Sequence, residues 1–146
     1  GNIYNPRHKE IKCIVEGKAR GNLIGGNLSI ICSSLGTENE IDTRNKILFI
    51  EEIGEEPNKV DRMLLQLVQA GKINDCAGII FGYFSSCEPS NPNQSLTISE
   101  VIKELIKPCG KPIIAGVACG HSLPSLTLPM GVEVVIDSKN KNIKII

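Results

Sequence analysis

The sequence predicts an α/β domain that contains a parallel layer of sheet and a smaller antiparallel layer. Three apolar runs without charged residues, 47–50, 77–82 and 113–117, are typical of strands buried on both faces, as in parallel sheets. Segments with helical periodicity lie between these runs in the chain, as expected where helices connect parallel strands. Pairs of shorter strand-like segments flank this alternating region and predict the antiparallel layer.

The first part of the chain is expected to hold a strand, a glycine-rich turn and a short helix. Residues 11–16 (IKCIVE) have the composition of a strand. Three glycines within residues 21–27 favour either tight turns or a backbone that another group approaches closely. We therefore predict a turn over residues 17–26. Asn27 is a suitable N-cap for a helix over residues 28–35.

The central part of the chain combines a buried strand, two carboxylates and an amphipathic helix. The strand at 47–50 ends at Glu51 and Glu52. Pro57 suits the first turn of the helix that follows. Its apolar positions repeat at i, i+3, i+4, i+7 and i+8: Val60, Met63, Leu64, Leu67 and Val68. Because parallel sheets gather functional groups at the carboxyl ends of their strands, Glu51 becomes a candidate site residue.

The second half of the chain repeats this alternation and ends in two short strands. A polar loop over 85–95 precedes a capping-box sequence at 97–100, which predicts the start of a helix. The third buried strand is expected at 113–117. Two further strands, at 132–136 and 142–146, are separated by turn residues.

Composition restricts the classes of protein to consider. The 146 residues fit one domain, and 16 basic residues balance 16 acidic ones, which argues against a nucleic-acid partner. No apolar run approaches the roughly 18 residues that cross a bilayer, and no signal-peptide pattern opens the chain, so we expect no membrane association. The cysteines form no C-x-x-C pair and have no histidine at ligand spacing, so we expect no metal site and no disulfide framework but reduced thiols.

Two strand ends carry residues with catalytic potential. Glu51 follows the strand at 47–50, and His121 follows the strand at 113–117, so both should lie at one edge of a parallel sheet. A carboxylate that binds the Nδ1–H of a histidine orients the imidazole as a base for a hydroxyl nucleophile. A solvated strand end and an ordinary loop residue are the simpler explanations. No G-x-S-x-G sequence supplies the nucleophile, so the catalytic group is incomplete in this chain.

Four blocks of sequence closely resemble the LD-carboxypeptidases, a family of serine peptidases, and follow the order found in that family. The blocks are 25–29 (GGNLS), 47–55 (ILFIEEIGE) with 60–67 (VDRMLLQL), 78–84 (GIIFGYF), and 120–121 (GH) with 126–131 (LTLPMG). Four ordered blocks over most of the chain make this resemblance much more specific than any one of them.

The resemblance implies a domain organisation and a set of site residues. Family members carry the nucleophilic serine in an N-terminal domain and the glutamate and histidine in a C-terminal domain of the swivelling β/β/α type. Residues 1–146 resemble that C-terminal domain alone, and the start at Gly1 rather than Met suggests a piece of a longer protein. The family's catalytic residues fall on Glu51 and His121, with Glu52 as an exposed neighbour. Residues 25–27 (Gly25, Gly26 and Asn27) would border the substrate, although a cap and a tight turn explain them equally well.

The resemblance also implies an activity. Family members are cytoplasmic, commonly homodimeric, and need no metal or other cofactor. They release the terminal D-Ala of murein tetrapeptides by hydrolysing an L-to-D amide bond during cell-wall recycling. On this basis the chain alone should be inactive, because it lacks the serine. Two alternatives are a hydrolase like the microcin C immunity proteins, which act on a peptidyl-adenylate mimic, and a binding module without catalysis.

Overall fold

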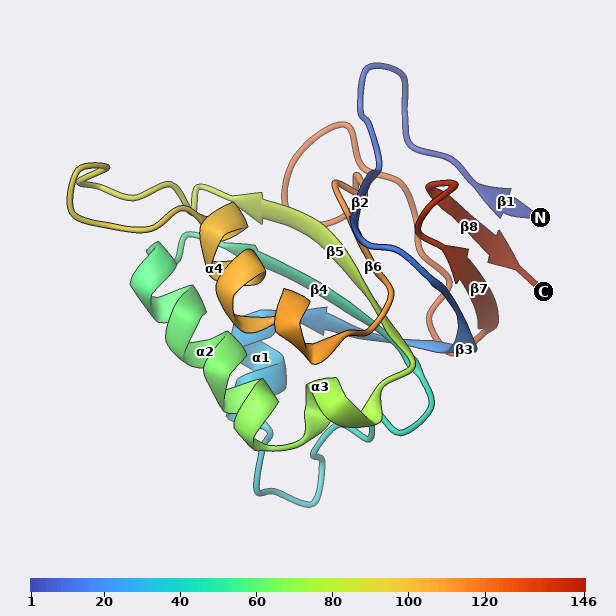
Figure 1. The fold of residues 1–146 in the computed structure, drawn as a ribbon, viewed down its shortest axis with the longest axis horizontal. Helices are drawn as coiled ribbons and strands as arrows, with labels where there is room; N and C mark the ends of the chain where they lie inside the picture. Colours follow the sequence, from blue (N-terminus) through green and yellow to red (C-terminus); the bar gives the residue numbers. More distant parts are fainter.

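A single curled sheet of eight strands organises the computed structural model, which describes residues 1–146 (Figure 1). The strands lie in the order β1-β8-β7-β3-β4-β5-β6-β2. Neighbours pair in parallel from β3 to β6 and antiparallel elsewhere. The strands are β1 (Asn2–Ile3), β2 (Lys12–Val15), β3 (Lys18–Asn27), β4 (Ile47–Ile53), β5 (Gly78–Ser85), β6 (Ile113–Ala115), β7 (Glu133–Asp137) and β8 (Asn142–Ile145).

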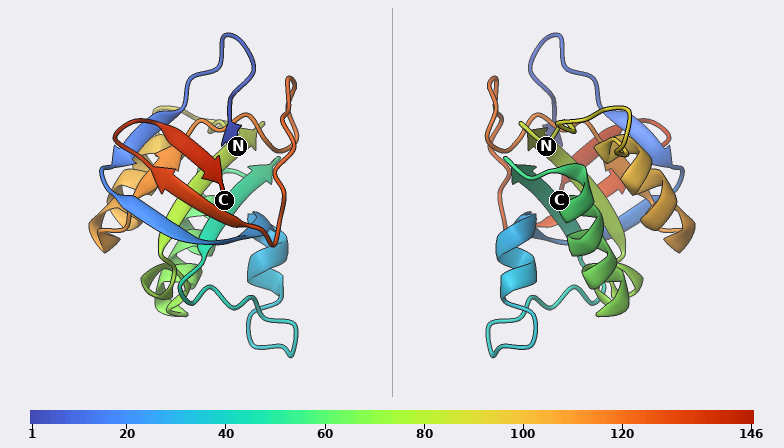
Figure 2. Two further views of the ribbon diagram at one scale, coloured as in Figure 1. Left: turned by 90° about the vertical axis from the view of Figure 1, so that its right-hand side faces the viewer. Right: turned by 90° about the vertical axis from the view of Figure 1, so that its left-hand side faces the viewer.

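Strand β3 joins the parallel and antiparallel parts of the sheet. Its residues 18–22 pair antiparallel with β7, and its residues 23–27 pair in parallel with β4. The prediction of a mixed α/β domain is confirmed. The two predicted layers are two regions of one continuous sheet, whose curl brings β7 and β8 across the parallel strands (Figure 2).

The prediction of a turn over residues 17–26 is wrong, because most of this segment forms β3. Its glycines allow the backbone of a neighbouring segment of the same chain to come unusually close. A Cβ atom on Gly25 would lie 2.0 Å from the carbonyl oxygen of Phe49, and one on Gly21 would lie 2.5 Å from the carbonyl oxygen of Asn45. For Gly21 and Gly25, the close approach of another backbone is therefore the right explanation of the two.

Helices cover one face of the parallel strands (Figure 1). They are α1 (Leu28–Ser33), α2 (Pro57–Gln69), α3 (Lys72–Asp75), α4 (Ile98–Leu105) and the short 3₁₀ helix η1 (Lys107–Cys109). The caps predicted at Asn27 and Thr97 are confirmed: the side chain of Asn27 accepts from the amide of Ile30, and that of Thr97 accepts from the amide of Glu100. Pro57 occupies the first position of α2.

The apolar side chains form one cluster on each face of the parallel strands. The cluster under the helices includes Ile79 and Leu64, and the cluster beneath β7 and β8 includes Ile80 and Ile136. Because side chains alternate along a strand, adjacent residues of β5 belong to different clusters. The parallel strands are thus buried on both sides, as their unbroken apolar runs predict. None of the helices is long and apolar enough to cross a membrane.

Candidate active site

Glu51 and His121 meet at the carboxyl edge of the parallel strands. The Nδ1 atom of His121 lies 2.8 Å from Oε2 of Glu51, although the two residues are 70 positions apart in the chain. The Glu51 side chain is 7% exposed and the His121 side chain 50% exposed. A carboxylate buried against one ring nitrogen favours the tautomer with the proton on Nδ1, which leaves the lone pair of Nε2 to accept a proton.

The fold brings these side chains together through strand direction and one glycine. Strands β4 and β6 both run parallel to β5, which lies between them, so their carboxyl ends share an edge. The loop after β6 then passes directly over the Glu51 carboxylate at Gly120, where φ is +134°. A Cβ atom there would lie 3.0 Å from Oε2 of Glu51. Gly120 therefore permits the approach that places His121 on Glu51.

The three candidate substrate-binding residues lie beside Glu51 at the end of β3. Asn27 is the register partner of Glu51, and Gly25 is the partner of Phe49. Asn27 also caps α1, and Gly25 packs against the β4 backbone, so both have structural roles. Gly26 faces open space, since nothing lies within 4 Å of the position its Cβ atom would take. Their contact with a substrate stays a prediction.

The expectation that Glu52 is exposed is wrong, because only 2% of this residue is accessible. Its carboxylate accepts hydrogen bonds from Asn27 Nδ2 (2.9 Å), from the amide of Ser29 (2.7 Å) and from the amide of Ile53 (2.9 Å). The hydroxyl of Ser29 donates to it as well. Burial raises the pKa of Glu52, but the hydrogen bonds from Ser29, Ile53 and Asn27 outweigh burial and hold the pKa below its ordinary value. The burial of Glu52 was not predicted from the sequence. Because side chains alternate along a strand, Glu52 would be expected to point away from Glu51 and toward α1.

Within the chain, no serine hydroxyl or cysteine thiol is hydrogen-bonded to His121. The hydroxyl of Ser29 donates to Glu52. All six cysteines are free, and burial together with the Glu51 charge raises the pKa of the Cys119 thiol, which disfavours the nucleophilic thiolate. No group of three or more histidine, cysteine, aspartate or glutamate side chains is arranged to hold a metal ion.

The site lies within a segment that matches a known family. The model of the LD-carboxypeptidase C-terminal domain matches residues 20–136, which include both Glu51 and His121. The chain belongs to this family. The resemblance found in the four sequence blocks is thereby confirmed.

Curated members of the family include relatives with substantial sequence identity. The chain is 45% identical over 128 residues to a Bacillus subtilis protein named "Probable murein peptide carboxypeptidase", and this match covers 88% of the chain and 40% of the relative. It is 34% identical over 134 residues to the microcin C7 self-immunity protein MccF of Escherichia coli, covering 88% of the chain and 37% of MccF. The chain therefore spans less than half the length of these relatives.

Solved structures agree with the fold. MccF in complex with glutamyl sulfamoyl guanosine matches with a TM-score of 0.82 and 31% identity, over 94% of this chain and 41% of MccF. A muramoyltetrapeptide carboxypeptidase from Oxalobacter formigenes matches with a TM-score of 0.78 and 29% identity, over 94% of this chain and 49% of that protein. The curled mixed sheet is thus shared by relatives named for two different activities.

Proposed function

We propose that this chain supplies the catalytic histidine, and the glutamate that orients it, of a serine-type LD-carboxypeptidase. Such an enzyme releases the terminal D-Ala from murein tetrapeptide. The observation that carries the proposal is the contact between His121 Nδ1 and the buried Glu51 carboxylate. The 45% identity to the Bacillus subtilis relative supports this substrate class.

The geometry of the pair suits acyl transfer. Glu51 holds the Nδ1 proton of His121, so Nε2 takes the proton of the serine hydroxyl as its oxygen attacks the carbonyl carbon of the L-to-D amide bond. The buried negative charge stabilises the imidazolium that forms. The imidazolium then gives this proton to the leaving amine of D-Ala. Nε2 then takes a proton from a water molecule as its oxygen attacks the acyl-enzyme. The imidazolium gives this proton to the serine oxygen, which leaves as the free hydroxyl.

The nucleophilic serine, in this proposal, belongs to a domain that precedes residues 1–146 in the complete polypeptide. The relatives support this organisation, since the chain covers 40% of the Bacillus subtilis protein and 37% of MccF. The chain then represents a C-terminal domain of the swivelling β/β/α type. We further propose that the complete enzyme is cytoplasmic and homodimeric and needs no cofactor.

The test is D-Ala release from murein tetrapeptide by the full-length protein that contains this chain. Replacing His121→Ala or Glu51→Gln should lower turnover by about 10⁴- to 10⁶-fold, the range of losses seen when the carboxylate or the histidine of a catalytic triad is removed. His8→Ala is the matched control, since it removes the other histidine, which is exposed and makes no hydrogen bond to Glu51. Near-normal turnover in His121→Ala or in Glu51→Gln would contradict the assignment.

The chain without further domains provides a second test. It should release no D-Ala, because no nucleophile contacts His121 within it. Release by residues 1–146 alone would place the nucleophile inside this chain and overturn the divided site. If the domain is instead a binding module without catalysis, the function of the full-length protein should not depend on His121.

A second candidate is hydrolysis of an aminoacyl or peptidyl nucleotide mimic, as expected of a protein like MccF. The match to MccF bound to glutamyl sulfamoyl guanosine favours it. Assaying the full-length protein on both substrates discriminates between the candidates, because the substrate with the higher kcat/KM identifies the preferred activity. Whichever activity the protein has, the variants His121→Ala and Glu51→Gln should lose it.

A further inference from the structure

His121 lies in a segment without regular secondary structure, between β6 and β7. Its side chain is half exposed, and its hydrogen bond within the chain is the one to Glu51. The position of the imidazole therefore depends on how firmly the backbone on both sides of His121 is held.

Strand β5 binds this segment on both sides of His121. Before the histidine, the amide of Tyr83 donates to the carbonyl oxygen of Cys119 at 2.8 Å. After it, the Tyr83 hydroxyl donates to the carbonyl oxygen of Pro124 at 2.6 Å. The hydroxyl of Ser85 is hydrogen-bonded to the hydroxyl of Ser122, the residue next to His121.

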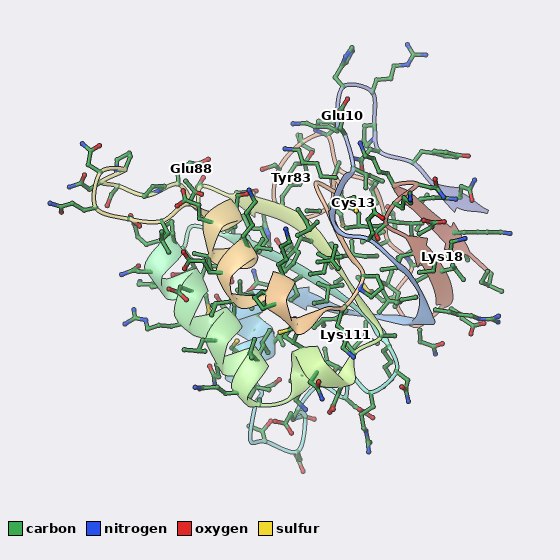
Figure 3. All side chains as sticks on the ribbon, in the orientation of Figure 1. Glu10, Cys13, Lys18, Tyr83, Glu88 and Lys111 are labelled. Atoms are coloured by element: carbon green, nitrogen blue, oxygen red, sulfur yellow. The ribbon has the colours of Figure 1, made fainter.

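Tyr83 and Ser85 belong to the same face of β5, because alternate residues of a strand point the same way. Figure 3 shows Tyr83 beside the loop that follows β6. The ammonium group of Lys9 lies 5.7 Å from the centre of the Tyr83 ring, and Gly120 packs against the tyrosine Cβ. The Lys9 ammonium thus lies over the ring, and the hydroxyl at the end of the ring reaches Pro124.

We propose that Tyr83 and Ser85 are positioning residues, which hold the backbone on both sides of His121 so that the imidazole stays on Glu51. The catalytic consequence rests on the proposed function, whereas the positioning itself does not. A loosened segment would let water compete for Nδ1, and the base would be correctly oriented for less of the time. Neither hydroxyl contacts His121 or Glu51 directly, so both residues act through the backbone and Ser122.

The experiment is nuclear magnetic resonance on the 146-residue chain labelled with ¹⁵N-histidine. The ring ¹⁵N shifts report which nitrogen carries the proton, and His8 provides an internal reference. In the wild type, His121 should carry its proton on Nδ1. Tyr83→Phe or Ser85→Ala should speed exchange of that proton with water by about fivefold, the factor that one hydrogen bond of ordinary net strength provides. The double variant should shift His121 toward the tautomer mixture of His8.

Controls separate positioning from general loosening. Tyr4→Phe removes the hydroxyl of the other tyrosine, which bonds only to Asn2, and should leave the His121 signals unchanged. Ser85→Thr keeps a hydroxyl and should restore slow exchange. Urea unfolding of each variant should show the wild-type slope, since Tyr83→Phe removes a single oxygen atom.

Unchanged His121 signals in the double variant would overturn the proposal. A wild-type His121 without its proton on Nδ1 would instead contradict the acid–base pair, so failure of the two proposals can be told apart. In the full-length enzyme, Tyr83→Phe should lower kcat about fivefold and leave KM unchanged, because the tyrosine orients the base rather than the substrate.

Discussion

Two adjacent glutamates at the end of β4 have opposite surroundings. Glu51 faces His121, to which it is hydrogen-bonded, and Glu52 is turned toward α1, where backbone and side-chain groups donate to it. Because each carboxylate has its own face of the sheet, Glu52 does not compete with Glu51 for the imidazole. The buried Glu52 instead fixes the end of β3 and the start of α1 against β4.

Replacing Glu52→Gln should lower the free energy of unfolding by about 1–3 kcal/mol at neutral pH, because an amide cannot accept all the hydrogen bonds that reach the carboxylate. Urea unfolding of the 146-residue chain measures this change. Glu88→Gln is the control, since Glu88 is exposed, and should change stability by less than about 0.5 kcal/mol.

Stability should also depend on pH through Glu52. Its pKa is lowered in the folded chain, so its contribution is present above the unfolded pKa of about 4.3 and is lost as pH falls through the folded value. The difference in unfolding free energy between wild type and Glu52→Gln should therefore shrink on acidification. A difference that stays constant from neutral to acidic pH would contradict this role.

At this scale the sequence predicts the positions of Glu51 and His121 but not the burial of Glu52. The first two follow from strand direction, which a run of apolar residues reveals. The surroundings of Glu52 depend on how α1 sits against β4, where Ser29 supplies two of its donors. That contact spans 23 residues and leaves no local pattern in the chain.

Among the elements, β3 depends most on the absence of side chains. At Gly25, φ is +123° and a Cβ atom would collide with the β4 carbonyl of Phe49. At the next residue, Gly26, φ is +149° but the space is open. The two glycines therefore share an unusual backbone conformation and differ in the room around them.

Gly25→Ala should destabilise the chain more than Gly26→Ala does. Both variants bear the cost of an unfavourable backbone conformation, about 1–3 kcal/mol. Gly25→Ala adds the cost of forcing β3 and β4 apart, about 1–3 kcal/mol more. Thermal unfolding of the two variants measures the difference, and equal midpoints would show that the close approach is unimportant.

Helices α1, α2 and α4 could be predicted from sequence because their signals are local. Apolar periodicity in α2 and the caps Asn27 and Thr97 lie within the elements that they define. Gly21 and Gly25 of β3, in contrast, are explained by the close backbone of a segment distant in the sequence. Read alone, they favour a turn, which is why residues 17–26 were assigned incorrectly.

For the whole molecule, the shared sheet couples the two apolar clusters. Ile79 and Ile80 are both fully buried, one in each cluster. Ile79→Ala and Ile80→Ala should each lower the free energy of unfolding by about 2–5 kcal/mol. Circular dichroism and tyrosine fluorescence should follow one coincident transition in each variant. Ile30→Ala is the control, since Ile30 is 69% exposed and outside both clusters. Two separate transitions would show that the clusters unfold independently.

The strand order has a consequence for synthesis of the chain on the ribosome. Strand β2 pairs with β6, and β1 pairs with β8, so the earliest strands to be made have the latest partners. Pairing across such sequence distances is slow, whereas β4 and β5, which pair with each other, are separated in the chain only by the segment that holds α2 and α3. The parallel centre is therefore available to fold early, and the two edges of the sheet wait for their partners. The sheet can be complete only after Lys144 has left the ribosome, because Lys144 is the register partner of Asn2.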